Sequence, residues 1–344
     1  MNTSASRQPG EMASAAQQNG EGRAMVVNGN LDDAVNGTAS TSLDWEEFEV
    51  NIGWGTMRGK IRGKGPRLML GVHGWLDNAN TFDLLAPHLP KDVRFLSLDL
   101  PGHGRSDHFP PGFIYDPRGY MGAIRKTVMA IGWKRFIYLG HSMGAVVGIM
   151  YAATFPEDVA AFISIDIIKV WSLTPEKQPA AMKKYFLQLF DNEDKASQPA
   201  LVYKEEELVR RTMDGSRSLD ERGARILLQR GARRVEGGTG LVLTRDLRVK
   251  AYFIGFITLD EWVEMARAIT SPTLICKASE GHEYEKKDPE GLKAMLEGFK
   301  QGCQHFRYYD IQGKHHIHLT AVDAVANPIT RFLDSIKELG HNLG

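Results

Sequence analysis

The sequence predicts an α/β fold in which helices flank a mostly parallel central sheet and a helical cap is inserted after the sixth strand. Two observations lead to this prediction. Short apolar runs alternate with segments of helix-like apolar spacing, which is typical of βαβ units and a parallel sheet. The alternation is broken once, by a long, charged and mostly helical segment over residues 169–269.

The expected strands follow one another in a regular order; the first hairpin shows alternation, and most later strands are short apolar runs. Residues 48–52 and 56–62 are separated by Gly53-Trp54-Gly55, which predicts a hairpin. The later strands are expected at residues 67–72, 93–98, 136–139, 160–165, 273–277 and 306–311. The helices outside the cap are expected at residues 81–89, 117–131, 143–154 and 323–338.

The chain is predicted to have three parts. Residues 1–42 are rich in Ser, Ala, Asn, Gly and Gln, a composition that cannot bury enough surface to offset ordering entropy, so this segment is predicted to be disordered. Residues 43–168 and 270–344 form the core that contains the sheet. Residues 169–269 form the cap, or lid, over the carboxyl ends of the strands, where open α/β sheets bind their ligands.

Composition argues against several functional classes. The formal net charge is zero, which disfavours a nucleic-acid partner because no basic excess is available to neutralise phosphates. The two cysteines, Cys276 and Cys303, supply neither a disulfide framework nor a zinc set. No apolar run approaches the roughly 20 residues of a membrane span, and no secretory signal is apparent. A cytoplasmic protein with a small-molecule substrate is expected, and no oligomeric state follows from the sequence.

The pentapeptide Gly140-His141-Ser142-Met143-Gly144 is the strongest candidate for chemistry. It follows an apolar run and precedes a helix of small residues, the strand–turn–helix context of a nucleophile elbow. The turn is tight, so the residues two before and two after the serine must be small. The serine also stands at a helix N-terminus, whose dipole favours developing negative charge. We therefore predict Ser142 as a nucleophile.

A second motif, His73-Gly74-Trp75, ends the strand expected at residues 67–72. An oxyanion hole needs backbone N–H groups aimed at the oxygen of a tetrahedral intermediate. Trp75 is expected to supply one of them and Met143, directly after the serine, the other. The residues predicted to line the substrate pocket are His73, Gly74, His141 and Trp171.

The base and the acid are expected late in the chain and at strand ends. A serine at its free pKa is a weak nucleophile and needs a base, for which His315 is predicted, with His316 and His318 as alternatives. Glu280 and Asp166 both follow strands and compete as the acid. Glu280 is preferred because its loop lies nearest in order to the histidine strand. The three histidines lack the spacing of a zinc helix, so no metal and no cofactor are expected.

The same motifs resemble a known family. Residues 99–106 resemble the D-x-P-G-x-G-x-S segment of α/β-fold hydrolases, and residues 73–75, the pentapeptide and the late histidine follow the order of that family. Residues 226–231, 244–248 and 313–319 resemble the serine hydrolase-like (kraken) group. The resemblance covers residues 43–344 and implies an α/β-hydrolase fold, with His315 in the catalytic place of the H-x-x-h-L pattern. The family often has an Asp in a G-x-x-D segment where this chain offers Glu280.

Together these residues predict a serine hydrolase that acts on a small or medium carboxylic ester, or a related carbonyl compound, through an acyl-enzyme. Two alternatives stay open. The same triad could hydrolyse a thioester or a carbon–carbon bond, since fold and triad do not choose between these reactions. The chain could also be a non-catalytic, ligand-binding homologue. Relatives with an Asp nucleophile, such as haloalkane dehalogenases and epoxide hydrolases, are disfavoured because the elbow carries Ser142.

Overall fold

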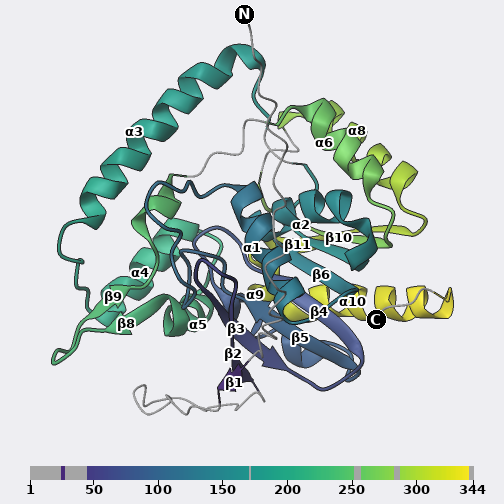
Figure 1. Cartoon of the computed structure of the whole chain (residues 1–344). Helices are drawn as coiled ribbons and strands as arrows, with labels where there is room; N and C mark the ends of the chain where they lie inside the picture. Colours follow the sequence, from purple (N-terminus) through teal and green to yellow (C-terminus); the bar gives the residue numbers. More distant parts are fainter. Residues whose placement is uncertain (1–24, 28–44, 170–171, 252–256, 283–286, 341–344) are drawn as a thin grey trace, which may run out of the picture.

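The computed structural model describes residues 25–27, 45–169, 172–251, 257–282 and 287–340 (Figure 1). Within these residues a nine-stranded sheet has the order β1-β2-β3-β5-β4-β6-β7-β10-β11. The strands from β1 to β5 in this order pair antiparallel, and all those from β5 to β11 pair parallel. The mostly parallel sheet is thereby confirmed. Its strands are β1 (Met25–Val27), β2 (Glu46–Asn51), β3 (Thr56–Arg62), β4 (Arg67–Val72), β5 (Val93–Leu98), β6 (Phe136–His141), β7 (Val159–Ile165), β10 (Thr273–Glu280) and β11 (Phe306–Lys314).

Two expectations about local structure are wrong. Residues 25–27 lie in the segment predicted to be disordered, yet they form β1 and pair with β2. The other residues of the predicted disordered segment lie outside the described ranges. The helix expected at 81–89 is replaced by two short 3₁₀ turns, η1 (Ala79–Phe82) and η2 (Ala86–His88). Pro87 explains the break, because a proline inside a helix removes a hydrogen bond and clashes with the preceding turn.

Helices cover both faces of the sheet. On one face, α1 (Pro117–Ala130), α2 (Met143–Thr154), α6 (Leu259–Ala268) and α8 (Pro289–Gly302) share a hydrophobic core with the strands. On the other, α10 (Val322–Glu338) packs with η1 and η2. The buried stripe of α10 follows helical spacing, as an amphipathic helix requires. No helix in the described ranges has both the length and the apolar character needed to cross a membrane.

Residues 172–251, called the insert here, connect β7 to α6. They contain α3 (Gln178–Ala196), α4 (Glu205–Ser216), α5 (Glu221–Gly231), the hairpin of β8 (Ala232–Arg234) and β9 (Leu241–Leu243), and η5 (Leu247–Lys250). Figure 1 shows α3, α4 and α5 on the side of the sheet away from α6 and α8. The expected cap range, 169–269, is too long at its end, because α6 packs against α2 and α8 in the layer that covers the sheet.

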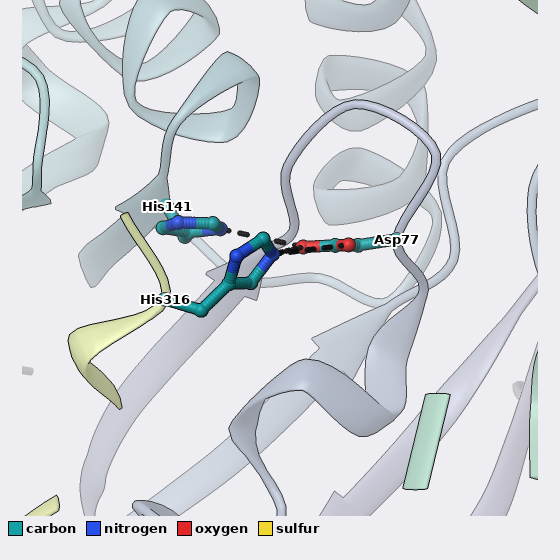
Figure 2. A group of neighbouring side chains, drawn as sticks. All are labelled: Asp77, His141 and His316. Carbon is teal, nitrogen blue, oxygen red and sulfur yellow. Dashed lines mark hydrogen bonds and ion pairs between the residues drawn. The ribbon is translucent and has the colours of Figure 1, made fainter. Parts of the chain in front are cut away.

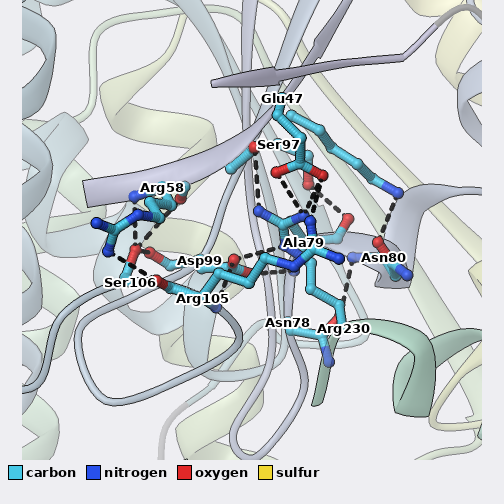
Figure 3. A network of polar contacts seen from close by, with 12 residues as sticks. Glu47, Arg58, Asn78, Ala79, Asn80, Ser97, Asp99, Arg105, Ser106 and Arg230 are labelled. Atoms are coloured by element: carbon cyan, nitrogen blue, oxygen red, sulfur yellow. Dashed lines mark hydrogen bonds and ion pairs between the residues drawn. The ribbon is translucent and has the colours of Figure 1, made fainter. Parts of the chain in front are cut away.

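Arg230 on α5 holds the insert against the sheet (Figure 3). Its Nε–H donates to Asp99 at 2.5 Å and its Nη1–H to Glu47 at 2.8 Å. The side-chain amide of Asn78 adds a hydrogen bond to the carbonyl of Leu227, also on α5, at 2.8 Å. A buried guanidinium is tolerated only where carboxylates and carbonyls satisfy it. The contact therefore fixes α5, and with it the insert, over the carboxyl end of β5.

Candidate active site

Ser142 occupies a tight turn between β6 and α2. Its backbone has φ 51° and ψ −118°, in the region that non-glycine residues rarely adopt. A Cβ on Gly140 would lie 2.6 Å from the backbone of Ala145, and one on Gly144 would lie 2.0 Å from the carbonyl oxygen of Val72. Only glycine fits at these two positions, so the expected need for small residues around the serine is confirmed.

Three side chains from three strand ends meet at this turn. Ser142 Oγ lies 2.8 Å from Nε2 of His315, which follows β11, and His315 Nδ1 lies 2.5 Å from Oδ2 of Asp166, which follows β7. An ionised carboxylate can only accept, so Nδ1–H donates to Asp166 and Nε2 is left to accept the Ser142 hydroxyl proton. The arrangement has the geometry of a nucleophile, a base and an orienting acid.

Asp166 is held in place by several donors. It is completely buried and has φ 61°, which turns its side chain away from the end of β7. Its Oδ1 accepts from Lys277 Nζ at 2.5 Å and from the Ala278 backbone N–H at 3.0 Å. Burial would raise the pKa of this carboxyl, but the hydrogen bonds and charges of His315 and Lys277 outweigh burial and lower it. Asp166 therefore stays ionised.

His315 is held in its neutral form by its surroundings. Burial lowers its pKa to about 3, although the hydrogen bond that Nδ1–H donates to Asp166 acts in the opposite direction. The rings of His141 and His282 lie 4.6 Å and 4.0 Å from its ring, centroid to centroid, and their charge repulsion also disfavours the imidazolium. A neutral imidazole at ordinary pH can take a proton from Ser142.

The preference for Glu280 as the acid is contradicted by the geometry. Glu280 is exposed, is the last residue of β10, and accepts a hydrogen bond from Gln312 at 2.8 Å. β10 continues three residues beyond Lys277, the last residue of the expected strand. The longer strand places Glu280 next to Gln312, whereas Asp166, the alternative, lies 2.5 Å from His315 Nδ1. The order of the loops along the chain therefore did not predict which carboxylate lies beside His315.

A cavity of about 1400 Å³ opens above these residues and is bounded by strand ends and by the insert. Gly74, Trp75, His141 and Met143 line it together with Ser142 and His315. Met143 is the first residue of α2, so its backbone N–H is one of the donors that a helix leaves without an intrahelical acceptor. Trp75 also donates from Nε1 to the carbonyl of Val249 in the insert, at 2.7 Å.

One of the expected pocket residues, His73, does not lie on the wall of this cavity. His73 is completely buried behind it, where Nδ1–H donates to the Gly74 carbonyl and Nε2 accepts the Leu100 backbone N–H, at 2.7 and 2.9 Å. It therefore fixes the loop that follows β4, and the expectation that it lines the pocket is wrong. Trp171 lies outside the described residues.

The other late histidines have partners of their own. His316 faces Asp77 through Nε2 at 3.2 Å and Ser218 of the insert through Nδ1 at 2.6 Å. His318 is completely buried and lies 2.8 Å from the hydroxyl of Thr81. Neither contacts Ser142, so His315 is the histidine that the fold brings to the serine.

Asp77, His141 and His316 form a buried group on the floor of the cavity (Figure 2). Each offers one donor atom, and these atoms lie within 4.8 Å of one another, so of the residues described this is the group that could hold a metal ion. Asp77 Oδ2 lies 3.4 Å from His141 Nδ1. The three residues come from the loop after β4, the end of β6 and the turn after β11, so no spacing in the sequence indicates the group. Asp77, Lys277 and His282 are polar neighbours of the site that sequence reasoning missed.

The comparisons with known proteins agree with this fold. Residues 67–322 match the family described as alpha/beta hydrolase fold. "Probable serine hydrolase" of Drosophila melanogaster is 33% identical over 294 residues, which are 84% of this chain and 88% of that protein. "Serine hydrolase-like protein 2" of Homo sapiens is 33% identical over 83% of this chain and 93% of its own. A solved structure of a hypothetical protein from Pseudomonas aeruginosa PAO1 has a TM-score of 0.74 and 27% identity, covering 84% of this chain and 99% of that one.

Proposed function

Because this chain belongs to the α/β-hydrolase fold family and is a hydrolase, we propose that it acts as a serine hydrolase with Ser142, His315 and Asp166 as its triad. The observation that carries the proposal is the continuous hydrogen-bonded chain from the Ser142 hydroxyl through His315 to a buried carboxylate. Its two distances, 2.8 and 2.5 Å, are within reach of direct proton transfer.

The reaction proceeds in two steps. His315 Nε2 takes the proton of Ser142 as Oγ attacks the substrate carbonyl, and Asp166 stabilises the imidazolium that forms. The tetrahedral intermediate collapses when His315 protonates the leaving oxygen, which leaves Ser142 acylated. Water then attacks the acyl group, with His315 again as base, and releases the acid.

The negative charge on the carbonyl oxygen needs donors that are already oriented. The backbone N–H groups of Met143 and Trp75 take this role in the proposal, because both residues border the cavity next to Ser142. The N-terminus of α2 adds its dipole at the same point. This placement supports both residues as the oxyanion hole.

The insert takes the role of the cap in this proposal. It forms much of the cavity wall, including leucines on α4 and α5, and so shields the serine from bulk water. A cavity of about 1400 Å³ exceeds the roughly 300–1,000 Å³ of common ligand pockets, so it has room for an ester of medium size. The substrate class proposed is accordingly a carboxylic ester.

A fluorophosphonate probe tests the nucleophile directly, because it reacts with an activated serine whatever the natural substrate. We expect the native protein to be labelled and Ser142→Ala to be unlabelled. Ser216→Ala is the matched control, since Ser216 lines the same cavity and should leave labelling intact. An unlabelled native protein would sink the catalytic proposal and favour a binding protein. A parallel panel of 4-nitrophenyl esters, thioesters and diketones then identifies the bond that is cleaved.

A further inference from the structure

The wall of the cavity formed by the insert carries an excess of positive charge. Arg211 on α4, Arg245 before η5 and Lys250 at the end of η5 all line the cavity that contains Ser142. Among the described residues none of these three side chains forms an ion pair with a carboxylate. Arg211 lies over the ring of Tyr203, 5.1 Å from its centroid, which is a contact with an aromatic face and not with an anion.

Arg245 is the least satisfied of the three. Its Nε is buried and has no hydrogen-bond partner among the described residues. Burial lowers the pKa of its guanidinium, and the charge of Arg211 acts in the same direction. Burial also lowers the pKa of Lys250, with the charges of Arg245, Lys195 and Arg211 adding to the effect. The like charges of these three side chains repel one another, and a bound anion would relieve that repulsion.

Arg248, three residues further along, shows what a structural arginine looks like in the same segment. Its Nη2–H donates to Asp246 at 2.7 Å and to the Phe109 carbonyl at 2.5 Å, and its Nη1–H donates to the Pro110 carbonyl at 3.2 Å. Every part of that guanidinium has an acceptor supplied by the protein. Arg245 lacks such acceptors, so its partner is expected to come from outside the chain.

The carboxylates on the cavity wall do not supply that partner. Asp246 is occupied by Arg248, and Asp77 lies on the floor with His141 and His316. Glu193 on α3 also lines the cavity but forms no ion pair with the three cations. An anion that enters with the ligand would remove the repulsion and satisfy the unpaired donors.

We propose that Arg211, Arg245 and Lys250 form an anion subsite that binds a carboxylate or phosphate group of the compound cleaved at Ser142. The planar fork of an arginine matches both groups in bidentate geometry, while a lysine adds a point charge. The proposal rests on the proposed function in one respect, namely that the bound anion is part of the substrate. The substrate class is then an ester with an acidic group at its far end.

Paired substrates that differ only in charge test the subsite. The mono-4-nitrophenyl esters of dicarboxylic acids from succinate to suberate are compared with their methyl-capped neutral counterparts, and an analogue with a terminal phosphonate distinguishes phosphate from carboxylate. We expect kcat/KM to favour the best acidic substrate by about tenfold or more, as charge-assisted hydrogen bonds imply, and the ratio to fall with added salt. Equal rates, or a preference for the neutral esters throughout the series, would overturn the proposal.

Arg245→Gln and Arg211→Gln should each lower this ratio severalfold, because the acidic ester loses more kcat/KM than the neutral ester does. Arg222→Gln, an exposed arginine on α5 that does not line the cavity, is the control of equal charge change. If Arg245→Gln keeps the full ratio of kcat/KM between the acidic and the neutral ester, the subsite is wrongly assigned. Fluorophosphonate labelling of the same variants separates this failure from a failure of the triad, since labelling at Ser142 needs no anion.

Thermal unfolding without substrate distinguishes a binding arginine from a structural one. Removal of an unpaired cation should leave Tm unchanged or raise it, so Arg245→Gln is expected to be at least as stable as the native protein. Inorganic phosphate and glutarate, added separately, should raise Tm of the native protein more than that of Arg245→Gln. A lowered Tm in Arg245→Gln, with neither anion stabilising the native protein, would show that Arg245 serves the fold.

Discussion

Asp99 and Asp166 are both completely buried, and each comes directly after a strand in the parallel part of the sheet. Each also accepts hydrogen bonds from a backbone N–H and from a cationic side chain. The difference lies in the titratable partner. The cation on Asp99 is the guanidinium of Arg230, which cannot be deprotonated in proteins, whereas Asp166 faces the imidazole of His315 in addition to Lys277.

That difference separates a structural carboxylate from a candidate catalytic one. The guanidinium of Arg230 stays charged, and the insert depends on its pair with Asp99 for its attachment to the sheet (Figure 3). The Asp166–His315 pair can take up and release a proton, and its free ring nitrogen points at a serine on the cavity wall. Burial at a strand end is common to both residues, so burial alone does not identify a catalytic acid.

The largest effect is expected from Asp166→Asn. The amide keeps the size of the side chain but no longer fixes the tautomer that lets Nε2 accept from Ser142, so kcat should fall about 10⁴-fold. Steady-state kinetics on a 4-nitrophenyl ester measure this loss. Glu280→Gln is the matched control, and as an exposed substitution it should change the rate by about twofold at most. The reverse pattern would restore Glu280 as the acid.

The second-largest effect is expected at Asp99, the buried carboxylate that pairs with Arg230. Arg230→Gln leaves Asp99 buried without its cation, which should lower the free energy of unfolding by about 3–5 kcal/mol. Arg225→Gln, on the same helix, is the control, because its pairs with Glu206 and Glu221 are exposed and should contribute little to stability. Urea denaturation of both variants measures the difference. Equal losses would mean that Arg230 does not anchor the insert.

The same two carboxylates show how far the sequence could predict the site. Ser142 and His315 were predictable because each stands in a motif whose backbone context is local, a strand followed by a tight turn or the start of a helix. The acid was not predictable in this way. Asp166 and Glu280 both follow strands, and the choice between them depends on the left-handed backbone at Asp166 and on where β10 ends.

The fold, like the site, was only partly predictable from the sequence. The central strands of the parallel sheet were predictable because they are apolar runs buried on both faces, as in β6 and β7. The attachment of the insert was not, since Arg230 and Asp99 are far apart in the chain and form a pair only after the sheet and α5 are in place. Long-range polar contacts of this kind leave no periodic signal in a sequence.

A smaller effect is expected when the cation beside Asp166 is removed. Lys277→Met deletes the hydrogen bond to Oδ1, so the free energy of unfolding should fall by about 1.5–3 kcal/mol and the pKa of Asp166 should rise. Lys293→Met on α8, an exposed position, should change stability by about 0.5 kcal/mol or less. Chemical denaturation measures both. If Lys277→Met costs as much as Arg230→Gln, the two carboxylates depend equally on their cations and the contrast between them fails.

The smallest expected effect is that of pH on activity near neutrality. Burial holds the pKa of His315 far below its ordinary value, at about 3, so the base stays neutral as the pH falls from 8 to 6.5. Over that range kcat/KM should change by less than about twofold, and activity should be lost only in more acidic solution as His315 takes up a proton. A pH–rate profile measures this, and an acidic limb centred at or above pH 6.5 would contradict it.

The same histidine makes the stability of the folded state depend on pH. The unfolded chain binds a proton at His315 near pH 6.5 while the folded chain does not, so the folded state loses stability as the pH falls below that value. Between pH 7.5 and 6.0 this amounts to about 0.8 kcal/mol for one histidine. His315→Gln should therefore flatten the pH dependence of unfolding by that amount. Arg230→Gln should leave this slope unchanged, because a guanidinium stays charged throughout. If both variants altered the slope equally, proton exchange would not distinguish the Asp166 pair from the Asp99 pair.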